Sequence, residues 1–120
     1  MNKQQALHNF WNSFNLEAYD ESTVPDDALF PYITYESPSD SFGNSISARA
    51  SIWYRSNSWS AFTLKEEQIS LDISRGGKMV AYDGGAMWIQ RSNPWAQRLS
   101  DPDDDTIRRI VLNISIEFMD

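Results

Sequence analysis

The sequence predicts one α+β domain, with a mainly antiparallel sheet of about five strands and two helices packed on one face of it. A chain of 120 residues is the length of a single domain, and its hydrophobic residues are spread along all of it, so one core is sufficient. Two segments repeat apolar residues at helical spacing, whereas five others have the alternation or composition of strands. Three of these strands follow one another near the end, which favours antiparallel pairing. We expect the order α-β-β-α-β-β-β within a single domain, 1–120.

A short amphipathic helix is expected over residues 4–14. Its apolar residues recur three or four positions apart, which places them on one helical face: Leu7, Phe10, Trp11 and Phe14. Residues 15–31 contain Pro25, Pro31 and several acids and predict an extended connector. Residues 32–36 then supply β-branched and aromatic residues for a strand, and residues 37–45 predict a turn or loop.

A half-buried strand and a second helix are expected next. Residues 46–55 alternate Ile46, Ala48, Ala50, Ile52 and Tyr54 with Ser47, Arg49, Ser51, Trp53 and Arg55. Ser58 is a candidate cap for a helix that runs to about Ser74, and Gly76-Gly77 is expected to end it. The apolar side of this helix is expected to carry Trp59, Phe62, Leu64, Ile69 and Ile73.

The last part of the chain predicts a hairpin and a long strand. Residues 78–83 and 86–91 flank Gly84-Gly85, and Asp83-Gly84 is a strong hairpin signal. Residues 108–118 alternate in a way that suits a central strand, with the apolar set Ile110, Leu112, Ile114, Ile116 and Phe118.

Composition excludes several classes of function. The chain has no cysteine, so disulfides and cysteine-based metal or redox sites are impossible. It has no apolar run long enough for a signal peptide or a membrane span, so we expect a protein of the cytosol or of an assembly. The net charge is −7, and −6 of it lies in residues 1–48, which hold seven acids and one base. Such a charge favours solubility or an acidic surface and disfavours a general nucleic-acid binder.

The densest charge cluster contains Asp101, Asp103, Asp104 and Asp105. A calcium loop beginning at Asp101 would need glycine at its sixth position and glutamate at its twelfth, where this chain has Thr106 and Leu112. A solvated turn before the last strand is therefore the simplest interpretation. The single histidine has no cysteine partner, and no serine lies in a G-x-S-x-G motif. We expect no catalytic, cofactor or metal site, and no enzymatic activity.

Two of the five tryptophans are candidates for a protein interface. Trp53 lies on the polar side of its strand between arginines, and Trp95 follows Pro94 in an expected loop. Exposed tryptophan beside arginine is typical of interfaces between proteins. The alternative is that the second helix covers Trp53 or that the loop folds Trp95 inward. Trp11 and Trp59 lie on the apolar faces of the predicted helices and are expected in the core.

Several runs of sequence resemble the small tail-terminator, or tail-completion, proteins of siphophages and prophages, which are sometimes called minor capsid proteins. The resemblance covers nearly the whole chain and lies in ALHNFWNSFNLEAYDESTVPDDALFPYITYE, DSFGN, ASIWYRSNSW, YDGGAMWI and PWAQRLSDPDDDTIRRIVLNISIEF. It implies a virion protein of the tail or neck, assembled in the host cytoplasm. Such proteins form a ring, typically of six subunits, that stops polymerisation of the tail tube and joins the tail to the head connector, and DNA passes through its lumen.

A ring of this kind needs two different surfaces that meet head to tail. The expected contact pairs the aspartates of one subunit with arginines of the next, and its candidate residues are Trp53, Arg55, Arg91, Trp95, Arg98, Asp101, Asp103, Asp104 and Asp105. The expected partners are further copies of the chain, the tail-tube protein and the head connector or adaptor. A head-closure or adaptor ring of the neck is the alternative within the same class. A small metal-binding or ligand-binding module is the alternative from another class.

Overall fold

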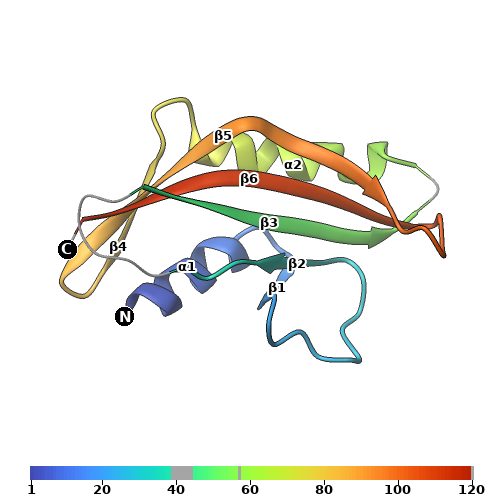
Figure 1. The fold of residues 1–120 in the computed structure, drawn as a ribbon, viewed down its shortest axis with the longest axis horizontal. Helices are drawn as coiled ribbons and strands as arrows, with labels where there is room; N and C mark the ends of the chain where they lie inside the picture. The colour runs from blue at the N-terminus through green and yellow to red at the C-terminus, as the bar shows by residue number, and fades with distance from the viewer. Residues whose placement is uncertain (39–44, 57, 120) are drawn as a thin grey trace.

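The computed structural model describes residues 1–38, 45–56 and 58–119, and it has the α+β architecture that the sequence predicts. Two helices and six strands follow one another along the chain (Figure 1): α1 Lys3–Asn12, β1 Glu17–Asp20, β2 Tyr32–Tyr35, β3 Ser45–Arg55, α2 Ser60–Ile73, β4 Lys78–Tyr82, β5 Gly85–Ser100 and β6 Ile107–Met119. Most of the expected loop at 37–45, namely residues 39–44, lies outside the described residues. No helix within the described ranges is long and apolar enough to cross a lipid bilayer.

The strands form one mixed sheet in the order β1-β2-β3-β6-β5-β4. All neighbouring strands are antiparallel except β1 and β2, which are parallel and pair Glu17 with Tyr32 through Asp20 with Tyr35. The expectation of about five strands missed β1, which lies in the segment predicted as a connector. A strand of four residues is too short to show a clear alternation in the sequence. Strand β1 forms because its backbone pairs with the edge of β2.

The centre of the sheet is β6, which pairs with β3 on one side and β5 on the other. Its register with β3 is continuous from Ser45 opposite Glu117 to Arg55 opposite Ile107. Alternate residues of β6 point to one side, and the apolar set that the sequence predicts is at most 1% exposed: Ile110, Leu112, Ile114, Ile116 and Phe118. The long final strand is therefore confirmed as the middle of the fold.

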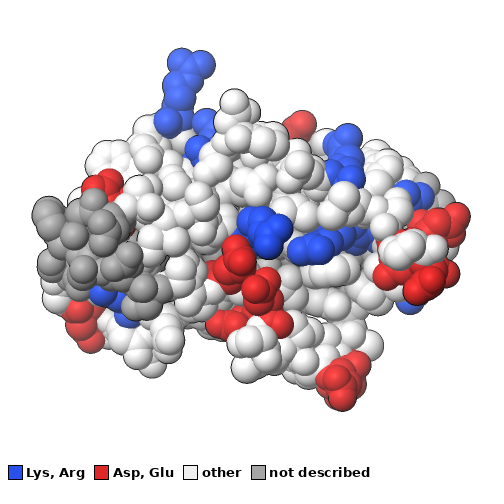
Figure 2. All heavy atoms as spheres, in the orientation of Figure 1, with Lys and Arg blue, Asp and Glu red and all other residues white. Residues whose placement is uncertain are grey.

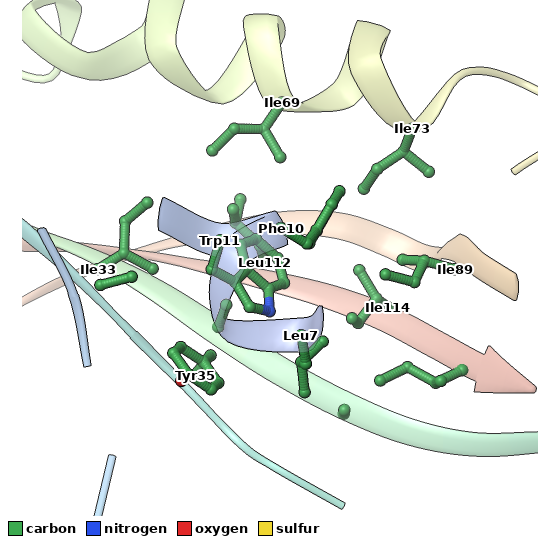
Figure 3. Close-up of a cluster of buried hydrophobic side chains, with 14 of the residues drawn as sticks. Leu7, Phe10, Trp11, Ile33, Tyr35, Ile69, Ile73, Ile89, Leu112 and Ile114 are labelled. Atoms are coloured by element: carbon green, nitrogen blue, oxygen red, sulfur yellow. The ribbon is translucent and has the colours of Figure 1, made fainter. Parts of the chain in front are cut away.

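Helix α1 packs its predicted apolar face into the core. Asn2 and Gln5 begin the helix with a capping box, in which each side chain accepts a hydrogen bond from the backbone N–H of the other. Leu7, Phe10 and Trp11 are buried and meet side chains of α2 and the sheet in one cluster (Figure 3). Both helices thus supply side chains to a single core.

Helix α2 differs from the prediction in its ends and in its apolar face. It begins at Ser60 after the N-cap residue Trp59, which makes no side-chain cap, and it ends at Ile73 before Gly76-Gly77 is reached. Ile69 and Ile73 are fully buried as expected, but Leu64 is 76% exposed. At 100° per residue, Leu64 lies on the far side of the helix from Ile69 and Ile73, so a single rotation cannot bury all three.

The connection from α2 to β4 and the following hairpin both use glycine at positive φ. Gly77 has φ 90°, and a Cβ atom there would collide with the indole of Trp88. Gly84, also at φ 90°, and Asp83 form the two-residue hairpin between β4 and β5, which confirms that prediction. Strand β5 is far longer than the predicted residues 86–91, because it continues beyond an irregularity between Arg91 and Ala96.

We expect Leu112→Ala to lower the free energy of unfolding by about 2–5 kcal/mol, because Leu112 is fully buried at the centre of β6 and the surrounding core would collapse only partly. Urea denaturation measures this change. Leu71→Ala is the matched control: Leu71 is 80% exposed on α2, so its removal should alter stability by less than about 0.5 kcal/mol. Equal effects of the two substitutions would contradict this description of the core.

Candidate assembly surfaces

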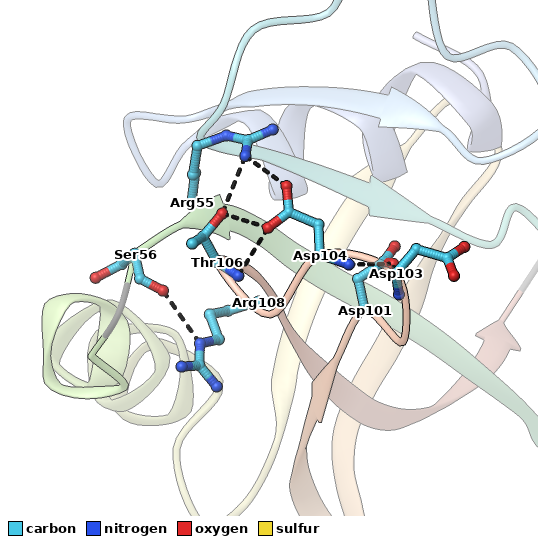
Figure 4. A network of polar contacts seen from close by, with 7 residues as sticks. All are labelled: Arg55, Ser56, Asp101, Asp103, Asp104, Thr106 and Arg108. Carbon is cyan, nitrogen blue, oxygen red and sulfur yellow. Dashed lines mark hydrogen bonds and ion pairs between the residues drawn. The ribbon is translucent and has the colours of Figure 1, made fainter.

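The aspartate cluster forms the turn between β5 and β6 (Figure 4), which lies at one end of the molecule (Figure 1). One carboxylate oxygen of Asp101 accepts hydrogen bonds from the backbone N–H groups of Asp103 and Asp104, at 2.8 and 3.2 Å. This pattern is the local turn that an aspartate side chain favours. We call residues Asp101 to Asp105 the acidic turn. Within the described part of the chain, no group of three or more His, Cys, Asp or Glu side chains is placed to hold a metal ion.

Asp104 is bound within its own chain. Its carboxylate accepts hydrogen bonds from the hydroxyl and the backbone N–H of Thr106, at 2.6 and 3.0 Å, and from the Arg55 guanidinium at 2.8 Å. The bonds from Thr106, followed by that from Arg55, lower the pKa of Asp104 from its ordinary 3.8 to about 2. Arg55 and Asp104, expected to face each other across a subunit contact, therefore pair inside one subunit.

The acidic turn still presents free carboxylates. The side chains of Asp103 and Asp105 are exposed, and neither makes a hydrogen bond or an ion pair with the described residues. The Arg55–Asp104 pair joins the turn to β3. Figure 2 shows acidic side chains gathered at the end of the molecule where this turn lies. Asp103 and Asp105 are thus the members of the cluster available to a partner.

The other predicted arginines bind neutral groups of their own chain. Arg91 donates to the Ser70 hydroxyl at 2.6 Å, and Arg98 donates to the Thr63 hydroxyl at 3.2 Å while its guanidinium lies 5.8 Å from the ring centre of Trp59. Neither arginine is within ion-pair distance of an acid among the described residues. Their positive charges therefore remain available at the surface, although their side chains are held in place.

Trp53 lies in a layer of aromatic and arginine side chains on the side of the sheet opposite the core. Its indole N–H donates to the Thr34 hydroxyl at 2.9 Å, its ring stacks near Tyr32, and the Arg109 guanidinium lies 4.8 Å from its ring centre. Burial, and then the nearby Arg49, lower the pKa of Arg109. Trp53 is half-buried by these contacts, and α2 does not cover it.

Trp95 lies within β5 and not in a loop as predicted. It occupies the irregular stretch between Arg91 and Ala96, where it packs partly against the core, and its buried indole nitrogen finds no hydrogen-bond partner among the described residues. A strand was not predicted there because Pro94 cannot donate to a ladder, but an irregular strand tolerates it. The alternative that Trp95 folds inward is the one closer to the structure.

Arg91 and Trp95 line an open hollow of about 380 Å³ together with Arg75, which was not among the residues predicted from the sequence. The lining contains no acid and consists of Arg75, Gln90, Arg91, Ser92, Asn93 and Trp95. Arg75 is exposed and makes no hydrogen bond or ion pair with the described residues. Its position after α2 carries no sequence signal, because only the fold brings the connection between α2 and β4 beside β5. Most of the predicted candidates therefore belong to three places: the acidic turn with Arg55 bound to it, the Trp53 layer and this basic hollow. Arg98 lies apart from all three, beside Thr63 and Trp59.

Comparisons with known proteins add no family to this description. No protein-family model matches the chain, and neither a curated protein nor a solved structure is significantly similar to it. The candidate surfaces therefore rest on the contacts, exposure and charges of this chain.

We expect Asp104→Asn to destabilise the protein near neutral pH and to have no such effect in strong acid. The folded-state pKa of Asp104, about 2, is below its ordinary 3.8, so its ionised form stabilises the fold above that ordinary value, and this contribution is lost as the pH falls towards 2. Urea denaturation of both proteins between about pH 7 and pH 2 should show their difference shrinking below about pH 4. Asp103→Asn, whose carboxylate has no partner among the described residues, should match the wild type throughout. A pH-independent loss in Asp104→Asn would contradict the assignment.

Proposed function

We propose that this protein is a structural component of a phage virion, a tail terminator that forms a ring at the head-proximal end of the tail tube. The observation that carries the proposal is the presence, on one chain, of separate acidic and basic surfaces whose charges have no partners among the described residues. A closed ring needs two unlike surfaces of this kind, since each subunit uses one for each neighbour. The resemblance of the sequence to tail terminators supplies the biological setting, including the tail tube and the head connector as partners.

The charge of the chain supports passage of DNA through the ring without tight binding. A net charge of −7 repels phosphate, and Arg49, close to the Trp53 layer, lies 3.8 Å from the carboxylate of Glu36. The role we propose is binding and not catalysis. The single histidine, His8, lies with its Nδ1 atom 3.0 Å from the Tyr35 hydroxyl and is not paired with a candidate nucleophile of the described chain.

Fewer charged residues are available for the proposed subunit contact than the sequence alone suggested. Asp104 and Arg55 satisfy each other within the chain, and Asp101 shapes the turn. The charges that we propose for pairing with a neighbouring subunit or with the connector are the remaining ones: Asp103, Asp105, Arg91 and Arg98. The two tryptophans, Trp53 and Trp95, are half-buried and are expected to contribute only their exposed edges.

We expect the purified protein to cap tail tubes. When it is mixed with polymerising tail-tube subunits of the same phage, electron microscopy should show tubes that stop growing at one end with a ring of added density. A head-closure or adaptor protein would bind the connector and leave tube length unchanged, so this measurement separates the two neck functions. Indefinite tube growth at saturating protein would remove the tail-terminator assignment.

We expect the pair of substitutions Asp103→Lys and Asp105→Lys to weaken attachment of the ring to its partner without unfolding the subunit. Both side chains are exposed and have no partner among the described residues, so the fold loses nothing, whereas a contact with arginines of a neighbour would become repulsive. Capping activity and its salt dependence measure the effect. The matched control is Glu17→Lys with Glu21→Lys, which changes the charge equally at two exposed acids beside β1. An equal loss in both variants would contradict a specific role for the acidic turn.

A further inference from the structure

The outward side of α2 carries two leucines that the fold leaves uncovered. Leu64 is 76% exposed and Leu71 is 80% exposed, while Ile69 and Ile73 on the opposite side of the helix are fully buried. The two leucines are seven residues apart, which places them two turns apart on the same side, at about 10 Å along the helix. An apolar pair held at this spacing on a rigid helix is suited to contact with another protein.

Basic residues border the C-terminal end of this apolar pair. Arg91 reaches α2 at Ser70, the neighbour of Leu71, and Arg75 follows the helix and lines the same hollow as Arg91. Neither arginine is paired with an acid among the described residues. We call Leu64, Leu71, Arg75 and Arg91 the α2 surface.

A second uncovered element, of the opposite charge, lies between β1 and β2. The backbone N–H of Ala28 donates to the carbonyl of Pro25 at 3.1 Å, which closes a turn with Asp26 and Asp27 at its centre. Both aspartates are exposed and make no hydrogen bond or ion pair with the described residues. Leu29, next to them, is 83% exposed. We call residues Pro25 to Leu29 the β1–β2 tip.

The β1–β2 tip and the α2 surface cannot meet within one molecule. Strand β1 is at one edge of the sheet, whereas α2 packs against β5, which is separated from β1 by β2, β3 and β6. Four strand spacings place these elements about 19 Å apart across the sheet. Figure 1 shows the β1–β2 loop and α2 at opposite edges of the molecule, and Figure 2 shows acidic side chains at the edge of the loop and a basic one projecting at the other.

We propose that the β1–β2 tip of one copy docks on the α2 surface of the next copy. Leu29 then packs on the apolar pair at its Leu71 end, and Asp26 and Asp27 face Arg75 and Arg91, so that apolar and charged groups are matched together. The two surfaces differ, so the contact is head to tail and repeats around a ring. The choice of a second copy as the occupant rests on the proposed ring function, and the match of charge and exposed leucine between the two surfaces supports it.

One residue of α2 allows a substitution that should strengthen the proposed contact and not weaken it. Glu67 is exposed, has no partner among the described residues, and lies between Leu64 and Leu71 in the sequence. Its carboxylate would repel the aspartates of a docked tip, so Glu67→Lys is expected to strengthen self-association. A substitution that acted only by disturbing α2 would weaken it.

Cross-linking tests the contact directly, because the chain has no cysteine of its own. The variant with Asp27→Cys and Arg75→Cys, treated with a short bis-maleimide, should give a ladder of covalent multimers. The matched control joins Asp27→Cys with Ser47→Cys, an exposed position on β3, and should give no covalent multimers under the same conditions. Equal cross-linking of the two variants, or none in the first, would overturn the proposal. Cross-linking of the cysteine introduced by Asp27→Cys to the tube protein, in place of another copy, would overturn it as well.

Charge reversal provides a second, independent measurement. One variant carries Asp26→Arg and Asp27→Arg, and the other carries Arg75→Asp and Arg91→Asp; each alone should lose at least about tenfold in self-association by analytical ultracentrifugation. An equal mixture should recover it, because every contact between the two reversed surfaces is again attractive. Circular dichroism confirms that both are folded, and a mixture that does not recover would contradict the contact.

These measurements separate this contact from the proposed function. Multimers that form through the tip and α2 but do not cap tail tubes would leave the contact in place and remove the tail-terminator role. If the protein caps tail tubes but its tip and α2 variants associate normally, the tail-terminator role would stand and the proposed contact would be removed.

Discussion

The pairing of β6 with β3 and β5 is the constraint on which the rest of this structure depends. The whole of β3, from Ser45 to Arg55, is in register with β6, and because the side-chain period of a strand is two, this register places a whole row of β6 on one side. That row belongs to the apolar face of the sheet, and the buried side chains of both helices pack with it in one core. A shift of one residue would expose it to solvent, so the hydrophobic pattern and the hydrogen-bonded ladder specify the same arrangement.

The same constraint determines which surfaces are free. Because the helices meet the apolar side of the sheet, the other side keeps its polar residues and arginines, among them Arg109 stacked on Trp53. Because β3, β5 and β6 are long, the turn between β5 and β6 is carried to one end of the molecule, with Arg55 holding it in place. The β1–β2 tip and α2 lie towards opposite edges of the sheet, because β2, β3 and β6 separate β1 from β5, the strand against which α2 packs. Charges and leucines without partners among the described residues are thereby distributed over distant places, as a subunit that binds on several sides requires.

The elements differ in how well the sequence predicts them. The long alternation of β6, the apolar spacing of α1 and the hairpin at Gly84 were predicted because each is a repeated or strongly local signal. Strand β1 was missed because it has only four residues and is defined by its pairing with β2, which the local sequence does not indicate. For Leu64 the prediction was wrong because α2 has a weak amphipathic pattern, and the rotation of the helix depended on which isoleucines the sheet could bury. Trp95 was assigned to a loop because Pro94 disfavours a regular strand.

By itself, the sequence determined the class of the fold, the central strand, the excess of acid and the exclusion of cysteine chemistry, because these depend on composition and on short-range periodicity. Only the tertiary structure decided which charges are free. Arg55 and Asp104 are 49 residues apart and pair within the chain, whereas Arg75 is left unpaired beside Arg91 among the described residues. Whether a charged or apolar side chain is available to a partner depends on what the fold places next to it, and contacts between residues distant in the chain carry no local signal.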